Sequence, residues 1–165
     1  MIRDDTRQTI KFIIWVIVIA ILLYIASIFV FFRASSIGRG NDRQIAQIAR
    51  QKTAITNVQT YYHLDRGVSS YALKGTDSKG KTYYFVYLPK TKKAYLYQAS
   101  KGTSQSKIKS TFTAAHKGAT IKGINLGWYQ NNPVWEVAYQ NSKGNLGYTL
   151  YDFKTGKAIN EVDNL

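Results

Sequence analysis

Cysteine is absent from this chain, and proline, histidine and acidic residues are scarce. Without cysteine there is no disulfide framework, no thiol nucleophile and no thiolate metal site. His63 and His116 are the two histidines, and two histidines far apart in a chain without cysteine do not make a zinc site. The sequence therefore predicts neither a metal nor a cofactor.

The few acidic residues also give no catalytic pair. Asp65, Asp77 and Asp152 fall in predicted turns, where aspartate commonly bonds the local backbone. Glu136 lies inside a predicted strand, and strand alternation sends it away from Trp135. General acid/base chemistry needs two carboxylates that face one pocket, and the glycines form no phosphate-binding loop. We therefore predict no catalytic residues and a protein that is not an enzyme.

Charge is also missing from one long apolar run, residues 12–32, which lies between Lys11 and Arg33. At about 1.5 Å per helical residue this run reaches about 31 Å, which matches the hydrocarbon core of a bilayer. We predict a single-pass transmembrane anchor at 12–32, preceded by a short cytoplasmic tail at 1–11. A cleaved secretory signal is the alternative, but the apolar part of such signals spans only about 7–15 residues.

Positive charge flanks both ends of the predicted anchor and so does not by itself set the orientation. Long domains translocate largely regardless of charge, so we expect the part that follows the anchor to lie outside the cytoplasm. From Asn41 onward, 18 lysines and arginines face 7 acidic residues, a balance of +11. Such a surface favours anionic lipid head groups, anionic wall polymers or nucleic acid. The lysines are scattered, so a merely solvated basic surface stays an equal alternative.

The chain has thirteen tyrosines, and all but Tyr24 lie in the same part of the sequence as these basic residues. Tyrosine on strands can stack nucleic-acid bases, but no RNP-like motif is present and an exported domain rarely meets nucleic acid. We therefore predict no nucleic-acid partner. Cross-strand and core packing is our first interpretation of the aromatic residues, and contact with a protein partner is the second. Trp128 and Tyr129, just before a predicted turn, are the candidate interface residues.

The remaining chain predicts an α+β fold with a linker at 33–40 and two units, 41–100 and 101–165. In the first unit, Asn41 or Asp42 caps a helix, whose apolar face is made by Ile45, Ile48, Ile55 and Val58. Strands follow around 62–64 and at 68–75, 81–88 and 94–98. In the second unit, Thr103 or Ser104 caps a helix that Gly118 ends, and strands follow at 119–129, 134–140, 145–151 and 157–162.

The two units repeat one another in sequence. When residues 71–98 are laid over 135–162, an offset of 64, nine of 28 positions are identical without a gap. Ser78-Lys79-Gly80 then aligns with Ser142-Lys143-Gly144. Such agreement predicts a duplication. Each unit would place one helix on one face of an antiparallel sheet.

Several segments carry a resemblance to a known family. They are Tyr-Ala-Leu-Lys-Gly-Thr-Asp-Ser-Lys-Gly at 71–80, Tyr-Tyr-Phe-Val-Tyr-Leu-Pro at 83–89, Val-Trp-Glu-Val-Ala-Tyr at 134–139 and Tyr-Thr-Leu-Tyr-Asp-Phe-Lys-Thr-Gly-Lys at 148–157. With the anchor, they resemble TseB-like proteins of low-GC Gram-positive bacteria, which are small membrane-anchored proteins linked to cell-wall elongation. The last segment also resembles the wider PepSY-like group. The resemblance implies two tandem cystatin-like domains outside the cell and association with a class B penicillin-binding protein, a peptidoglycan transpeptidase.

Three functions are consistent with these observations. The first is a membrane-tethered, non-enzymatic accessory protein that binds and tunes a cell-wall synthase during cell elongation. The second is a basic module that binds anionic wall polymers or lipid. The third is a PepSY-like inhibitor or regulator of a wall-associated peptidase or autolysin. The family resemblance supplies no catalytic or binding residues that could be carried over.

Overall fold

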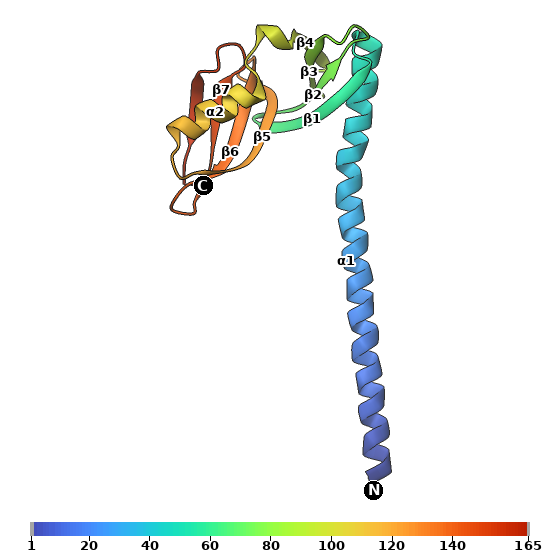
Figure 1. Cartoon of the computed structure of the whole chain (residues 1–165). Helices are drawn as coiled ribbons and strands as arrows, with labels where there is room; N and C mark the ends of the chain where they lie inside the picture. Colours follow the sequence, from blue (N-terminus) through green and yellow to red (C-terminus); the bar gives the residue numbers. More distant parts are fainter. Residues whose placement is uncertain (1, 165) are drawn as a thin grey trace. The chain divides into compact units, whose positions relative to one another are not determined.

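The structure is a computed structural model that describes the backbone of residues 2–164 and the side chains of residues 11–28 and 40–164. One long helix is followed by eight strands, a short 3-10 helix and a second α-helix (Figure 1). Their bounds are α1 Ile2–Lys52, β1 Asn57–Arg66, β2 Val68–Thr76, β3 Thr82–Leu88, β4 Lys93–Gln98, η1 Ala99–Lys101, α2 Gln105–Ala115, β5 Thr120–Tyr129, β6 Asn132–Gln140, β7 Leu146–Asp152 and β8 Ala158–Val162. The chain divides into two compact units, Met1–Asn41 and Asp42–Leu165, which are described separately.

The N-terminal unit consists of the greater part of helix α1. Its segment Lys11–Ile28 is long and apolar enough to cross a membrane, and its large apolar side chains are exposed. Residues 29–32 of the predicted anchor lie outside the described side chains, as do residues 1–10 of the predicted tail and 33–39 of the predicted linker.

Helix α1 does not begin anew at Asn41 or Asp42, where the sequence predicts a cap. Its backbone is helical without a break from Ile2 to Lys52, through the predicted linker. This range contains no proline. Gly38 and Gly40 each cost a helix only about 1 kcal/mol relative to alanine, which two long flanking helical segments can offset.

Helix α1 also ends earlier than its predicted apolar face, which included Ile55 and Val58. Thr53 ends it, because the Thr53 hydroxyl donates to the Ala49 carbonyl (2.7 Å) and accepts from the Ile55 backbone N–H (3.2 Å). Ile55 therefore packs from a loop and Val58 from strand β1. The helical spacing of these residues reflected a shared core and not a shared helix.

The eight strands form two four-stranded antiparallel sheets, a first sheet β1-β2-β3-β4 and a second sheet β5-β6-β7-β8. The strands follow the predicted order. The bounds of β2 and β3, moved by the predicted offset of 64 residues, coincide with those of β6 and β7. Each sheet also has a register shift in its first strand pair, between Val58 and Thr60 and between Ile121 and Gly123.

The first sheet is buried on both faces. Leu73 and Phe85, which are cross-strand partners, face the end of helix α1 and pack with Ile45, Ala49 and Ile55. Their neighbours in the strands point the other way, because side chains alternate along a strand. This opposite face contributes to a larger cluster, which we call the central core: Tyr62, Ala72, Tyr84, Val86, Leu88, Ile108, Phe112, Leu126, Trp128, Trp135, Val137, Tyr139, Tyr151 and Phe153.

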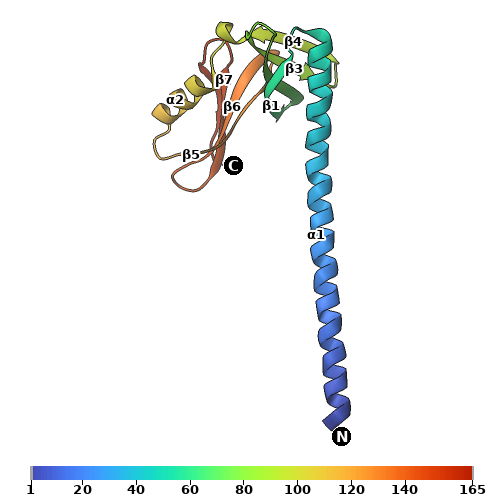
Figure 2. The same ribbon diagram turned by 45° about the vertical axis from the view of Figure 1, so that its right-hand side comes forward.

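The second sheet carries helix α2 on the face that contributes Trp135 to the central core. Figures 1 and 2 both show α2 lying along this sheet, and Ile108 and Phe112 are its fully buried residues. Glu136 points to the opposite face, as the alternation predicts. There it is buried and forms an ion pair with Arg66, whose guanidinium lies 3.7 Å from the centre of the Tyr148 ring.

Candidate functional site: a groove lined by hydrogen-bond donors

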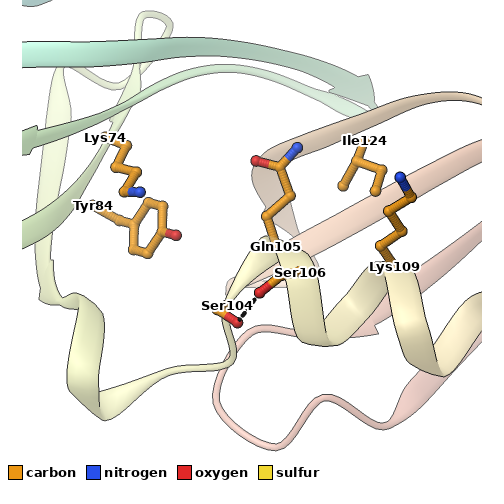
Figure 3. Close-up of a pocket in the computed structure, with 7 residues that line it drawn as sticks. All are labelled: Lys74, Tyr84, Ser104, Gln105, Ser106, Lys109 and Ile124. Carbon is orange, nitrogen blue, oxygen red and sulfur yellow. Dashed lines mark hydrogen bonds between the residues drawn. The ribbon is translucent and has the colours of Figure 1, made fainter.

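A groove of about 350 Å³ lies between the first sheet and the start of helix α2 (Figure 3). It is lined by Lys74, Tyr84, Ser104, Gln105, Ser106, Lys109 and Ile124. Its volume lies at the lower end of the range for ligand pockets and is about ten times the share of one water in the liquid. The groove therefore has room for more than solvent.

The sheet side of the groove is made by Lys74 and Tyr84, which face one another across strands β2 and β3. Only 3% of Tyr84 is exposed, and its ring packs edge-on against Trp135 and Phe153, with ring centres 5.5 Å apart in each case. Its hydroxyl points into the groove and has no hydrogen-bond partner among the described residues. Burial raises the pKa of Tyr84, so the hydroxyl stays a neutral donor at physiological pH.

The helix side of the groove is the N-terminus of α2. The Ser104 hydroxyl caps the helix by accepting from the Lys107 backbone N–H (3.2 Å), as predicted. The backbone N–H groups of Gln105 and Ser106 belong to the first turn, where no intrahelical acceptor exists. The Gln105 side chain is fixed by the Tyr62 hydroxyl, which donates to its amide oxygen (3.0 Å).

The electrostatic character of the groove is positive. None of its lining residues is acidic, and the first turn of α2 carries no acidic residue. The ion pairs found among the described residues, Arg66–Glu136 and His116–Glu161, do not involve Lys74 or Lys109. Two ammonium groups, three hydroxyls, an amide and free backbone N–H groups thus surround one cavity, and nearly all of them can donate hydrogen bonds.

The predicted interface residues lie elsewhere. Trp128 belongs to the central core, with 6% of its surface exposed and its ring stacked on Tyr95 at 4.2 Å. Its backbone N–H donates to the Ser70 hydroxyl (3.0 Å), so strand β2 covers this part of β5 and little of the Trp128 ring is available to a partner. Tyr129 is half-exposed, and its hydroxyl accepts from Asn160 (3.2 Å). An interface role for Trp128 and Tyr129 stays a prediction.

The histidines have separate surroundings. His63 stacks on Tyr71 with ring centres 4.6 Å apart, and its Nε2 lies 3.4 Å from the Ser69 hydroxyl. His116 follows the last residue of α2, and its Nε2 lies 3.0 Å from Glu161 Oε1. Within the described side chains, no group of three or more histidines and acidic residues is placed to hold a metal ion.

The sequence predicts the N-cap of helix α2 but gives no sign of the groove beside it. Ser104 was predicted as a helix cap, whereas Lys74 and Lys109 were two of many scattered lysines. They come together because the Tyr62–Gln105 hydrogen bond joins the first sheet to the start of α2 and the Tyr84–Trp135 contact joins the first sheet to strand β6. The pairing of His116 with Glu161, 45 residues apart, had no sequence signal either.

Comparison with known proteins gives two matches. The chain is 29% identical over 149 residues to the "Probable cell wall elongation regulator TseB" of Bacillus subtilis (strain 168), which covers 89% of this chain and 91% of that protein. The solved structure of the YpmB protein from Bacillus subtilis matches with a TM-score of 0.64 at 26% identity, over 72% of this chain and 93% of that one. No family model matches the sequence. Similarity along nearly the full length of this chain and of the regulator, together with the fold that the chain shares with YpmB, shows that this chain resembles the TseB-like proteins.

Proposed function

We propose that this protein is a membrane-anchored, non-enzymatic accessory protein that binds a class B penicillin-binding protein outside the cytoplasm and tunes cell-wall elongation. The observation that carries the proposal is the similarity to a cell-wall elongation regulator over 89% of the chain. A match over 149 residues is too long to be confined to one sheet, which supports a shared role more strongly than the match of a single module would.

The arrangement we propose follows the predicted boundaries. Residues 1–11 form a cytoplasmic tail, 12–32 the anchor and 33–40 the linker. Residues 41–100 and 101–165 form two cystatin-like, helix-plus-sheet units that arose by duplication. The apolar segment Lys11–Ile28 supports the anchor, and the coincidence of strand bounds at an offset of 64 residues supports the duplication.

Tethering explains how such a protein can act without a large interface. Two proteins confined to one membrane meet at a raised effective concentration, so a weak contact between them suffices. The chain needs no reaction of its own for this role. Its buried carboxylate, Glu136, is held by Arg66 in a contact that joins strand β1 to the second sheet.

Complementation tests the proposed role in elongation. The full-length chain is expressed in a Bacillus subtilis strain that lacks TseB, and cell length and width are measured. We expect the full chain to restore the dimensions of the parent strain, and a chain without residues 1–40 to fail because it is no longer tethered. Equal failure of both, with the full chain present in the membrane, would contradict the proposal.

Topology is tested in the same strain. A reporter that is active only outside the cytoplasm is fused after Leu165. We expect it to be active, and a reporter that is active only in the cytoplasm to be silent at the same position. The opposite result would place the sheets away from the wall and remove the basis of the proposed function.

A further inference from the structure

The groove between the first sheet and α2 has an unusual concentration of unused donors. The Tyr84 hydroxyl is the clearest case, because the side chain is almost fully buried and yet unpaired among the described residues. The ring is held by the core while the hydroxyl opens onto the groove, where solvent can reach it. It is therefore a fixed donor that a ligand in the groove can use without any rearrangement of the side chain.

The charges around the groove also favour an anionic ligand. Lys74 lies on the sheet side and Lys109 on the helix side, and no carboxylate of the described residues pairs with either. The helix start adds the positive end of the α2 dipole and the N–H groups of Gln105 and Ser106. Acidic residues usually occupy the first turn of a helix, and here none does. The positive potential is thus left for a ligand to compensate.

We infer that this groove binds a phosphate ester, with its anionic oxygens on Lys74, Lys109, the Tyr84 hydroxyl and the first turn of α2. A phosphate ester offers more acceptor oxygens than a carboxylate, which suits donors that converge from the sheet and the helix together. The groove is larger than one anion requires, and Ile124 provides an apolar wall for the carbon chain of the ester. This site is independent of the proposed contact with a synthase.

The first experiment measures binding to the full-length chain in non-ionic detergent. Glycerol 1-phosphate is titrated while the backbone amide signals of Gln105 and Ser106 are followed by NMR. We expect saturable shifts of these two signals. Acetate at the same concentration and ionic strength is the comparison, and we expect it to bind at least tenfold more weakly.

Three variants locate the site. Lys74→Gln with Lys109→Gln should weaken binding of glycerol 1-phosphate at least tenfold. Lys79→Gln with Lys143→Gln removes the same charge from two exposed turn lysines and should change the affinity less than twofold. Tyr84→Phe keeps the ring contacts and should weaken binding about three- to tenfold, in the range of one lost hydrogen bond. Because it removes an unpaired hydroxyl, Tyr84→Phe should leave the Tm of the ligand-free protein unchanged or raised.

The source of the phosphate is identified by two further probes, a soluble poly(glycerol phosphate) and vesicles of phosphatidylglycerol. Binding of either probe that is lost in the Lys74→Gln, Lys109→Gln variant supports the site and identifies whether its phosphate ester comes from a polymer or from a lipid. Three results would contradict a phosphate-ester site. They are no saturable shift at millimolar glycerol 1-phosphate, the same loss of affinity in the two double lysine variants, and acetate that binds as tightly as the phosphate ester. None of these results bears on complementation, so failure here is distinguishable from failure of the proposed function.

Discussion

The two halves of the Asp42–Leu165 unit are built alike but differ at the start of their helices. At an offset of 64 residues, the cap Ser104 corresponds to Gly40, which lies inside α1. The first half therefore has no helix N-terminus of its own, whereas the second half has a capped one with free N–H groups. The groove at the start of α2 depends on this difference and not on the repeated unit.

The two sheets also differ in which strand carries a glycine and which carries a tyrosine at one cross-strand pair. Gly75 pairs with Tyr83 in the first sheet, and Tyr139 pairs with Gly147 at the equivalent place in the second. Glycine and tyrosine have thus exchanged strands between the halves. The Tyr139 ring lies over Gly147 in the second sheet, whereas the atoms nearest to Gly75 in the first sheet belong to Asn57 and Ile55.

The largest expected change in stability comes from Trp135, because the second half contributes a more deeply buried side chain to the core than the first half does at the equivalent position. Trp135 is fully buried, and its indole N–H donates to the Thr103 carbonyl (2.8 Å). Its counterpart at the 64-residue offset, Tyr71, is half-buried. We expect Trp135→Ala to lower the free energy of unfolding by about 3–5 kcal/mol. Tyr71→Ala should cost about 1–2 kcal/mol. Urea unfolding of the full-length chain in non-ionic detergent measures both, and equal losses would contradict the comparison.

Alkaline pH tests the contact between the halves. Burial raises the pKa of Tyr62 from 10 to about 12. The folded state therefore keeps the phenol protonated after the unfolded chain has lost its proton, and stability should fall as the pH rises from 10 to 12. One pKa unit corresponds to about 1.4 kcal/mol, so the loss reaches about 3 kcal/mol.

Tyr62→Phe should make this alkaline loss shallower. At neutral pH it should cost about 1 kcal/mol, because the hydrogen bond to Gln105 is lost. Tyr61→Phe removes a neighbouring hydroxyl from a more exposed side chain and is the control. An alkaline stability curve that is the same for the wild type and Tyr62→Phe would show that Tyr62 does not carry the effect.

The exchanged glycine–tyrosine pairs predict similar penalties in both sheets. A Cβ atom at Gly147 would lie 2.7 Å from Tyr139 Cζ and from the Val162 carbonyl oxygen, and one at Gly75 would lie 2.6 Å from the Asn57 carbonyl oxygen. Alanine at either place should cost about 1–3 kcal/mol of unfolding free energy. Gly123→Ala meets no atom within 4 Å and should change stability by less than about 0.5 kcal/mol. A harmless Gly147→Ala would mean that Tyr139 does not lie over this glycine.

The smallest expected change in stability concerns the turns that follow strands β2 and β6. Asp77 accepts from the backbone N–H groups of Lys79 and Lys81 (2.9 Å each), and Asn141 accepts from Lys143 and Asn145 (3.0 Å each). The N–H of Lys81, more than other contacts, holds the pKa of Asp77 below its usual value. Its stabilising contribution is present above pH 3.8 and is lost as the pH falls through the lowered pKa.

Asp77→Asn should therefore preserve the first turn, as Asn141 does the second, and remove this acid-dependent contribution. Thermal unfolding between pH 2 and pH 5 is the measurement. A slope of Tm against pH that is as steep in Asp77→Asn as in the wild type would assign the acid dependence to other groups.

The sequence predicted most of the strands because their patterns are local. Alternating apolar residues and the turns at 77–80 and 141–144 set the strand order without knowledge of the packing. The helix boundaries near Asn41 and Val58 were wrong, because capping residues and apolar spacing do not reveal whether a helix continues or a core is shared. Thr53 ended the helix through a hydrogen bond that has no periodic signature.

The candidate site could not be predicted, because its residues come from different elements. Tyr84 has the same sequence context as other strand tyrosines, and only the packing of α2 beside it places its hydroxyl in the groove. Trp128 shows the converse. Its place before a predicted turn gave no indication that Ser70 of strand β2 would bond its backbone or that its ring would join the central core.

Crosslinking in cells tests the proposed role as a tethered partner of a wall synthase most directly. The full-length chain is crosslinked in living Bacillus subtilis, purified in detergent, and its partners are identified by mass spectrometry. The control is residues 1–41 fused to an unrelated domain, which shares the helix but not the sheets. We expect a class B penicillin-binding protein to be enriched over this control. Recovery of no wall-synthesis protein above the control would contradict the account.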